Sequence, residues 1–220
     1  MATLEGHSSY VFSVAFHPTA PFLATGSGDA TAKLWRLSSD NSSATCVATL
    51  EGHSGYVRFV SFHPTAPIMA TGSEDKTAKL WRLSSDNSSA TCVATLEGHS
   101  TTIWSVSFHP TAPLLATGSG DKTAKLWRLS SDNSSATCVA TLEVHNNTVA
   151  SVAFHPTAPL FATGGLDNIV KLWRLSSDNS SATCVATLEG CRSSVRSVAF
   201  HPTAPLLATG SDDGIVKLWR

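Results

Sequence analysis

Histidine, aspartate and tryptophan recur along this chain at one fixed interval, and all three residue types can take part in chemistry. The interval is 46 residues, as Trp35, Trp81 and Trp127 show. An imidazole, a carboxylate and a threonine hydroxyl are groups that acyl-transfer enzymes combine in a catalytic triad. Imidazoles and thiolates are the usual ligands of zinc. Nucleophilic catalysis and metal binding are therefore the two chemistries to weigh.

A second histidine series and a cysteine series bear on metal binding. These residues are His17, His63, His109, His155 and His201, then Cys46, Cys92, Cys138, Cys184 and Cys191. Equivalent residues of neighbouring units lie many ångströms apart, whereas a shared metal ion needs bonds of about 2 Å. The cysteines are odd in number and form no CxxC pair. We expect turn histidines, with no metal site, no disulfide framework and no cofactor.

Charge and hydrophobicity exclude other classes of function. The net charge is −1, from 15 basic and 16 acidic residues, so there is no broad positive field for nucleic acid or an anionic membrane. No run of 18 apolar residues could span a bilayer, and the N-terminus lacks the features of a secretory signal. We expect a soluble, cytoplasmic protein that binds neither nucleic acid nor membrane.

Each unit carries short β-rich runs that are separated by turn residues. In the first unit the pattern predicts strands at 11–16, 22–27, 31–36 and 46–50 and leaves no room for a helix. Val14, Phe16 and Leu34 cannot all point to one face of such a sheet, so each sheet must be stacked between neighbours. A polar loop and strand segment is identical in four copies, at 38–51, 84–97, 130–143 and 176–189. Copies this alike indicate recent amplification or engineering.

The order of motifs resembles the tryptophan-aspartate (WD) repeat of β-propellers. Each unit has Gly-His or a variant of it, a Val-x-Ser-Val-Ala-Phe type strand, Ala-Thr-Gly, an aspartate and Lys-Leu-Trp. The resemblance implies an all-β fold, a β-propeller of five WD-type four-stranded blades. The chain departs from the family pattern because arginine follows each tryptophan where the family has aspartate. That aspartate is not part of the family's internal hydrogen-bond network, so the fold expectation stands.

The spacing also predicts the blades and how the ring closes. We expect a single propeller domain over 1–220, with blades at about 9–50, 55–96, 101–142 and 147–188, and a last blade at 193–220 completed by a strand at 1–4. This strand exchange between the termini would be the velcro closure typical of propellers, which removes exposed edges. It could close five blades within one chain, or join two chains as a homodimer with ten blades. An open arc is the third possibility.

The resemblance further implies a structural tetrad of histidine, threonine, aspartate and tryptophan in each blade. The sets are His7, Thr25, Asp29 and Trp35; His53, Thr71, Asp75 and Trp81; His99, Thr117, Asp121 and Trp127; His145, Thr163, Asp167 and Trp173; and Cys191, Thr209, Asp213 and Trp219. A catalytic triad is disfavoured because the set recurs, its threonine lies in mid-strand, and no nucleophile elbow is present. A thiol cannot bridge hydroxyl and carboxylate as an imidazole does, so the fifth blade should be the loosest.

The copies differ at a few positions that, by resemblance, lie on the top face near the channel mouth. The candidate partner-binding residues are Tyr10, Phe12, Tyr56, Arg58, Glu74, Thr102, Trp104, Leu166, Arg196 and Asp212. Tyrosine, tryptophan and arginine are enriched in binding hot spots. The alternative is that Phe12 and Trp104 pack between blades and that the other differences are neutral drift.

Four functions remain open, and we favour a non-enzymatic scaffold that binds a protein or peptide of unknown identity across the top face. A glycosidase would need two facing carboxylates about 5–10 Å apart, and Glu74 and Asp212 show no such partnership. A carbohydrate-binding propeller is less favoured because the repeated tryptophan and aspartate are committed to the tetrads. The fourth possibility is an amplified or engineered array without a specific ligand.

Overall fold

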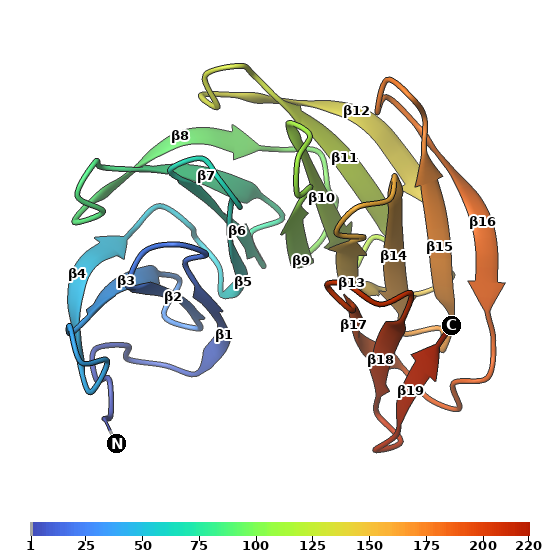
Figure 1. Cartoon of the computed structure of the whole chain (residues 1–220), viewed down its shortest axis with the longest axis horizontal. Coiled ribbons are helices and arrows are strands. Elements are labelled where there is room, and N and C mark those ends of the chain that lie inside the picture. The colour runs from blue at the N-terminus through green and yellow to red at the C-terminus, as the bar shows by residue number, and fades with distance from the viewer. Residues whose placement is uncertain (1) are drawn as a thin grey trace.

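The computed structural model describes residues 2–220, and its regular structure consists of β-strands (Figure 1). Blade 1 contains β1 (Val11–Phe16), β2 (Phe22–Ser27), β3 (Ala32–Leu37) and β4 (Ala44–Leu50); blade 2 contains β5 (Val57–Phe62), β6 (Ile68–Ser73), β7 (Ala78–Leu83) and β8 (Ala90–Leu96); blade 3 contains β9 (Ile103–Phe108), β10 (Leu114–Ser119), β11 (Thr123–Leu129) and β12 (Ala136–Glu143); blade 4 contains β13 (Val149–Phe154), β14 (Leu160–Gly165), β15 (Val170–Leu175) and β16 (Ala182–Leu188); and blade 5 contains β17 (Val195–Phe200), β18 (Leu207–Ser211) and β19 (Val216–Trp219). Among residues 2–220, no helix is long and apolar enough to cross a membrane. The all-β prediction of five propeller blades is confirmed.

Within a blade, consecutive strands pair antiparallel in chain order. The tight turn between the second and third strands needs a residue with positive φ. Ala30 (66°), Lys76 (71°), Lys122 (73°) and Asn168 (69°) adopt it in the first four blades, and Gly214 (76°) adopts it in the fifth. These turns bring the aspartate of each unit close to the start of the third strand.

Blades pack face to face through apolar side chains, which are buried on both sides of the inner sheets. Leu34, Leu80 and Leu126 are all 0% exposed. A glycine in the second strand of each of the first four blades allows the next blade to approach closely. A Cβ added at Gly118 would lie 2.8 Å from Val149 Cγ1 and 3.0 Å from Val152 Cγ1, which is too close for any side chain. Close packing between sheets therefore stabilises neighbouring units together.

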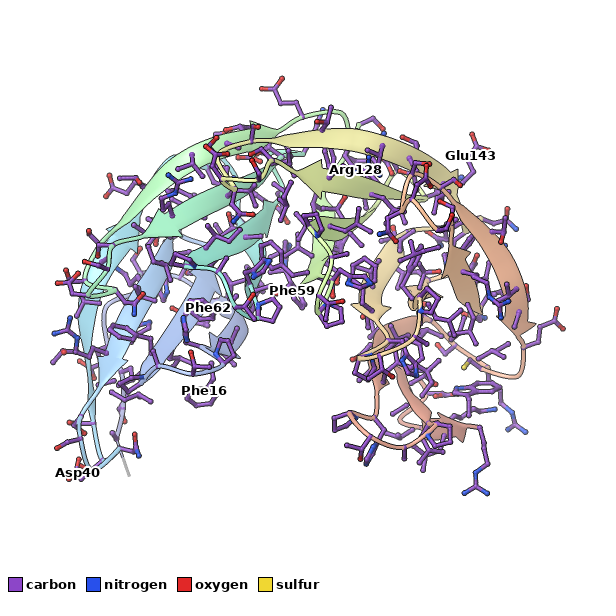
Figure 2. The ribbon with its side chains drawn as sticks, turned by 45° about the horizontal axis from the view of Figure 1, so that its top comes forward. Phe16, Asp40, Phe59, Phe62, Arg128 and Glu143 are labelled. Carbon is purple, nitrogen blue, oxygen red and sulfur yellow. The ribbon has the colours of Figure 1, made fainter. Side chains whose placement is uncertain are left out.

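Hydrogen bonds repeat across the blade junctions as well. The serine hydroxyls of Ser13, Ser105 and Ser151 accept the backbone N–H of a valine in the next blade at 3.1–3.2 Å. On the outer rim, Arg36 donates to the backbone carbonyl of Asp86 at 3.2 Å, and Arg128 donates to that of Asp178 at 2.5 Å. Figure 2 shows Arg128 on this rim. The arginine that departs from the family pattern thus joins adjacent blades.

The blades form an open arc, with the two chain ends on opposite sides of its gap (Figure 1). Blade 5 has three strands, and among residues 2–220 no fourth strand pairs with β19. Residues 2–4 form no strand, and residue 1, part of the closing strand expected at 1–4, lies outside the described residues. The expected closure within one chain is therefore not formed. The physical reason is that the blade junctions repeat one packing geometry, and five blades joined in this way do not complete a turn.

Candidate functional site

In four blades the histidine, threonine, aspartate and tryptophan form one hydrogen-bonded chain. In blade 3 the Trp127 indole N–H donates to Thr117 Oγ1 at 2.9 Å, Thr117 Oγ1 lies 2.7 Å from His99 Nε2, and His99 Nδ1 lies 2.7 Å from Asp121 Oδ2. The same contacts occur in the tetrads of His7, His53 and His145, at 2.7–3.0 Å. The chain of bonds joins the Gly-His turn or its variant to the second and third strands.

This arrangement suits a neutral histidine. In that form threonine accepts from the indole and donates its O–H to Nε2, and Nδ1 carries the proton that is donated to the aspartate. Burial lowers the pKa of His53, His99 and His145, and this effect outweighs the opposing influence of the aspartates. Burial also acts to raise the pKa of Asp121, but hydrogen bonds from Thr123 and His99 lower it to about 2. The His53–Asp75 and His99–Asp121 pairs are therefore each a neutral imidazole with an ionised carboxylate.

A triad would need an accessible nucleophile, and these threonines do not provide one. Thr71, Thr117 and Thr163 are 0% exposed, and their hydroxyl oxygens contact both the indole and the imidazole. Among residues 2–220, no buried side-chain nitrogen or oxygen lacks a hydrogen-bond partner. Buried and fully bonded hydroxyls of this kind stabilise a fold.

The fifth unit retains only part of the network. Trp219 Nε1 donates to Thr209 Oγ1 at 3.0 Å, but Cys191 stands at the histidine position. Asp213 is exposed and accepts a hydrogen bond from Ser211 instead. Blade 5 therefore has no bonded link from its threonine to its aspartate.

Sequence reasoning missed one further member of the network, the threonine two positions after the aspartate. The hydroxyls of Thr31, Thr77 and Thr123 donate to the aspartates at 2.6–2.7 Å. Their recurrence at one spacing in the first three units was the available signal. Ile169 and Ile215 replace them in blades 4 and 5, so those blades lose this bond.

The second histidine series has a structural contact of its own. His63 Nδ1 accepts the backbone N–H groups of Thr65 and Ala66 at 3.1 and 2.9 Å, which holds the His-Pro turn. The ring also packs edge to face against Phe108 of the next blade, with centroids 5.0 Å apart. Within residues 2–220, no group of three or more metal-ligating side chains is placed to hold an ion.

On the top face, the structure gathers six of the ten candidate partner-binding residues into one cluster with Arg58 at its centre. This set, the Arg58 cluster, consists of Tyr10, Phe12, Tyr56, Arg58, Glu74 and Trp104. The guanidinium carbon lies 4.1 Å from the Phe12 ring centroid, 4.8 Å from that of Trp104 and 5.5 Å from that of Tyr56. These distances are within cation–π range. The cluster therefore spans blades 1 to 3.

Glu74 balances the charge of Arg58 by accepting Nε–H at 2.8 Å and by an ion pair with the second guanidinium nitrogen. The rings of Phe12 and Tyr56 stack with centroids 5.9 Å apart. Tyr10 is 80% exposed, Tyr56 44% and Phe12 37%. The cluster thus combines an arginine fixed from several sides with large aromatic surface that faces water.

A backbone hydrogen bond in each blade joins the two regions in which the copies vary. The residue before the tetrad aspartate donates its N–H to a carbonyl near the start of the first strand, from Gly28 to Tyr10 and from Glu74 to Tyr56 at 2.8–2.9 Å. The same bond recurs in the other blades, at 2.9–3.0 Å, from Gly120 to Thr102, from Leu166 to Thr148 and from Asp212 to Ser194. Because only backbone atoms make this bond, the side chains at these positions are free to vary.

The other four candidate residues do not join the Arg58 cluster. Thr102 contributes the carbonyl that accepts the Gly120 N–H. Leu166 lies in blade 4, where its carbonyl accepts a weak bond from the Ser194 hydroxyl at 3.4 Å. In blade 5, Arg196 and Asp212 form an exposed two-pronged ion pair at 2.8–3.0 Å. The top face therefore has an aromatic sector on blades 1 to 3 and a separate polar sector on blade 5.

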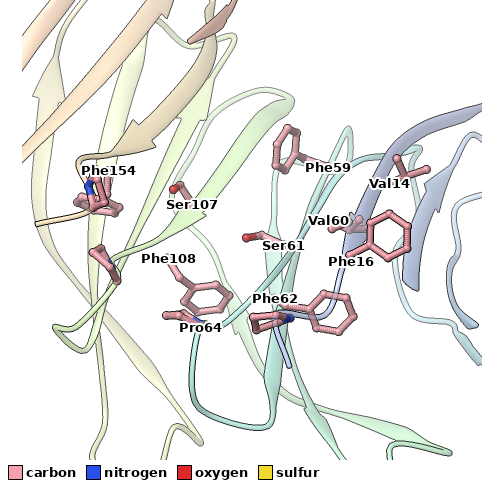
Figure 3. A pocket seen from close by; sticks show the side chains of 14 residues that line it. Val14, Phe16, Phe59, Val60, Ser61, Phe62, Pro64, Ser107, Phe108 and Phe154 are labelled. Carbon is pink, nitrogen blue, oxygen red and sulfur yellow. The ribbon is translucent and has the colours of Figure 1, made fainter. Parts of the chain in front are cut away.

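The opposite end of the inner strands opens into an apolar groove (Figure 3). Phe16, Phe62, Phe108 and Phe154 line it with prolines of the His-Pro turns. Phe62, Phe108 and Phe154 are 7–8% exposed, whereas Phe16 is 70% exposed because no blade stands in front of it. The groove follows from the stacking of the repeated phenylalanines.

The fold and the hydrogen-bond networks together define a β-propeller. It is built from repeated four-stranded units, and hydrogen-bonded tetrads stabilise these units. The family model described as WD domain, G-beta repeat matches residues 1–36, 44–82, 90–128, 136–174 and 182–220. The chain belongs to the WD40 repeat family, which confirms the resemblance seen in the sequence.

Curated relatives match one repeat's length of the chain. The F-box-like/WD repeat-containing protein TBL1Y of Homo sapiens is 43% identical over 42 residues, which is 19% of this chain and 8% of that protein. The F-box-like/WD repeat-containing protein TBL1X of Mus musculus gives the same values. The WD40 repeat-containing protein HOS15 of Arabidopsis thaliana is 49% identical over 41 residues, 19% of this chain and 7% of that protein. The similarity thus spans less than a tenth of each relative.

Proposed function

We propose that this protein is a non-enzymatic interaction scaffold that binds an extended peptide segment of a partner protein on the Arg58 cluster. The observation that carries the proposal is the fixed arginine packed among aromatic rings from neighbouring blades. Arg58 lies over the rings of Phe12, Tyr56 and Trp104, while Tyr10 and Tyr56 keep much of their surface in water. Rigid aromatic side chains bury large areas on binding and lose little conformational entropy.

The charge of the cluster indicates the chemistry of the peptide. Because Glu74 already pairs with Arg58, the cluster offers aromatic area and two tyrosine hydroxyls rather than an unpaired positive charge. An acidic motif would have to displace Glu74. We therefore expect the bound segment to carry a proline or an aromatic side chain and to be anchored by ring contacts and phenol hydrogen bonds.

The same geometry argues against the other functions. Glu74 and Asp212, the acids considered for glycoside hydrolysis, are tied to Arg58 and Arg196 respectively. The hydrogen bond from Arg196 lowers the pKa of Asp212, whereas a catalytic acid needs a raised one. The tetrad tryptophans of the first four blades are buried and leave no face for a sugar to stack on, with Trp35 3% exposed and Trp81 2% exposed. A peptide ligand is consistent with these constraints.

The test is selection from a displayed random-peptide library, followed by titration of the selected peptides. The Tyr56→Ala/Trp104→Ala variant should weaken each selected peptide by at least tenfold, because it removes two ring contacts. The matched control is Arg196→Ala/Asp212→Ala, which alters the blade 5 sector of the same face and should keep the affinity. Peptides that bind the aromatic variant as well as the original protein, or a library that yields no binder, would refute the proposal.

A further inference from the structure

The two end blades expose apolar residues whose equivalents at the junctions between blades are buried. Val14 is 64% exposed, whereas Val60 and Val106 are each 1% exposed. At the other end Leu218 is 69% exposed, whereas Leu34, Leu80 and Leu126 are 0% exposed. Among residues 2–220, no blade covers these two end faces.

We infer that these two faces bind each other between two copies of this chain, so that blade 5 of each copy packs against blade 1 of the other. The inference does not depend on the proposed peptide site, because the end faces lie outside the Arg58 cluster. A second copy is the occupant because it presents the required surface. In every inner junction, the back of one blade receives the front of the next, and these are the two faces left open.

Close packing supports this pairing. Added Cβ atoms at Gly26, Gly72, Gly118 and Gly164 would lie 2.8–2.9 Å from a valine or isoleucine methyl of the next blade. An added Cβ at Gly210, the fifth member of this series, would have no atom within 4 Å. The repeat places Val11 and Val14 of a second copy over Gly210. They are 49% and 64% exposed in the single chain.

Within residues 2–220 the outer edge of β19 has no strand partner, and this edge gives the strand register. In blade 1, Ala32 pairs with Leu50 and Lys33 with Thr49, and Lys33 Nζ donates to Thr49 Oγ1 at 2.8 Å. Val216 and Lys217 are the blade 5 equivalents of Ala32 and Lys33. The same register would therefore pair Val216 with Leu4 and Lys217 with Thr3 of the second copy. In the single chain Lys217 bonds the Gly190 carbonyl instead. The segment 2–4 has the same Ala-Thr-Leu sequence as 48–50.

Two more contacts are expected if the junction between the two copies repeats the contacts between neighbouring blades. His155 packs edge to face on Phe200 with centroids 4.9 Å apart, so His201 should pack on Phe16 of the second copy, which is 70% exposed here. Arg128 bonds the Asp178 carbonyl, so Arg220 should bond the carbonyl of Asp40 of the second copy. Figure 2 shows Asp40 and Phe16 at the free end of blade 1. Each open group on one end thus has a matching group on the other.

Two such contacts made reciprocally close a ring of ten blades and leave no strand edge open. Head-to-tail contacts that close in this way give a defined assembly, whereas contacts that do not close give filaments. Pairing requires each blade junction to open relative to the arc of the single chain, and the change is shared by all of the junctions.

The experiment measures mass in solution by light scattering after size-exclusion chromatography, at several micromolar concentrations. The unaltered chain should have the mass of two chains. Gly210→Leu fills the space that the second copy needs, and Val14→Asp puts a charge on the opposing face. Each variant alone should fall to the mass of one chain, because each blocks both contacts of a symmetric pair. Cys92→Asp is the control, since Cys92 is an exposed residue on the outer strand β8 of an inner blade, and it should keep the mass of two chains.

Mixing the two variants distinguishes this arrangement from other dimers. The intact blade 1 of Gly210→Leu can bind the intact blade 5 of Val14→Asp, so an equimolar mixture should regain the mass of two chains. Far-ultraviolet circular dichroism of each variant checks that the strands are retained. A mass of one chain for the unaltered protein, a ladder of larger masses that grows with concentration, or a dimer that survives either variant would overturn the inference.

Discussion

Removing a single tetrad hydroxyl should cost much more stability in blade 3 than in blade 5. Thr117→Val preserves the shape of the side chain but deprives two buried groups of their partner, the Trp127 indole N–H and His99 Nε2. Trp127 is 3% exposed and His99 6%, so water cannot replace the lost bonds. Each unsatisfied buried group costs about 1–3 kcal/mol, which gives about 2–6 kcal/mol for the variant.

Thr209→Val is the matched control in blade 5. Cys191 replaces the histidine there, so the substitution affects only the Trp219 indole N–H. That indole is partly exposed and can bond water, so the expected cost is about 0.5–1.5 kcal/mol. The two variants remove the same hydroxyl and differ only in what the hydroxyl supports.

Urea unfolding followed by circular dichroism and tryptophan fluorescence measures both costs. The free energies come from the shift in midpoint multiplied by the slope of the transition. Thr117→Val should shift the midpoint at least twice as far as Thr209→Val. Equal shifts would show that the hydroxyl acts alone and that the hydrogen-bonded chain adds nothing, which would refute the account of the tetrads.

Three further results are expected. Cys191→His should restore a partner for the buried Thr209 hydroxyl, adding about 1 kcal/mol and raising the melting temperature by about 2–4 °C; an unchanged melting temperature would contradict this. The pKa of His53, His99 and His145 lies below the unfolded value of 6.5, so the unfolded chain binds protons first as the pH falls. Stability should therefore be full above about pH 6.5 and decrease below it, and a melting temperature that is flat or rises from pH 7.5 to 5.5 would refute the neutral-imidazole assignment. Arg82→Asp restores the residue of the family pattern but removes the bond to the Asp132 carbonyl; because this contact is exposed, the melting temperature should fall by only a few degrees, and an increase would show that the arginine does not join the blades.

The sequence predicted the strands and the tetrad partners well because both depend on residue type at a fixed spacing. Strands expected at 11–16 and 22–27 have those bounds in the structure, and the expected fourth strand at 46–50 begins two residues earlier, at Ala44. The Thr31 bond to Asp29 was missed although it follows the same spacing. A hydroxyl beside a tight turn is common, so its residue type alone did not mark it as a network member.

Contacts between blades could not be predicted to the same degree. Side chains from different units meet only after the junction geometry is fixed, and no spacing within a unit encodes that geometry. The placement of Arg58 between Phe12 and Trp104 depends on it, as does the bond from Arg36 to the next outer loop. The openness of the arc also results from the junction angle, which explains why the motif pattern did not distinguish an arc from a closed ring.

The division between constant and varied positions has a physical basis in the hydrogen bonds that each position makes. Tetrad side chains bond one another, so a change such as the cysteine at 191 removes two contacts at once. The varied residues before the aspartates take part in the repeated hydrogen bonds only through a backbone N–H, as Glu74 does when it donates to the Tyr56 carbonyl. Glycine, glutamate, leucine and aspartate can therefore all occupy this position without loss of the turn. A face built in this way can change its recognition chemistry blade by blade while the tetrads keep the blades folded, which is what a repeated scaffold for binding requires.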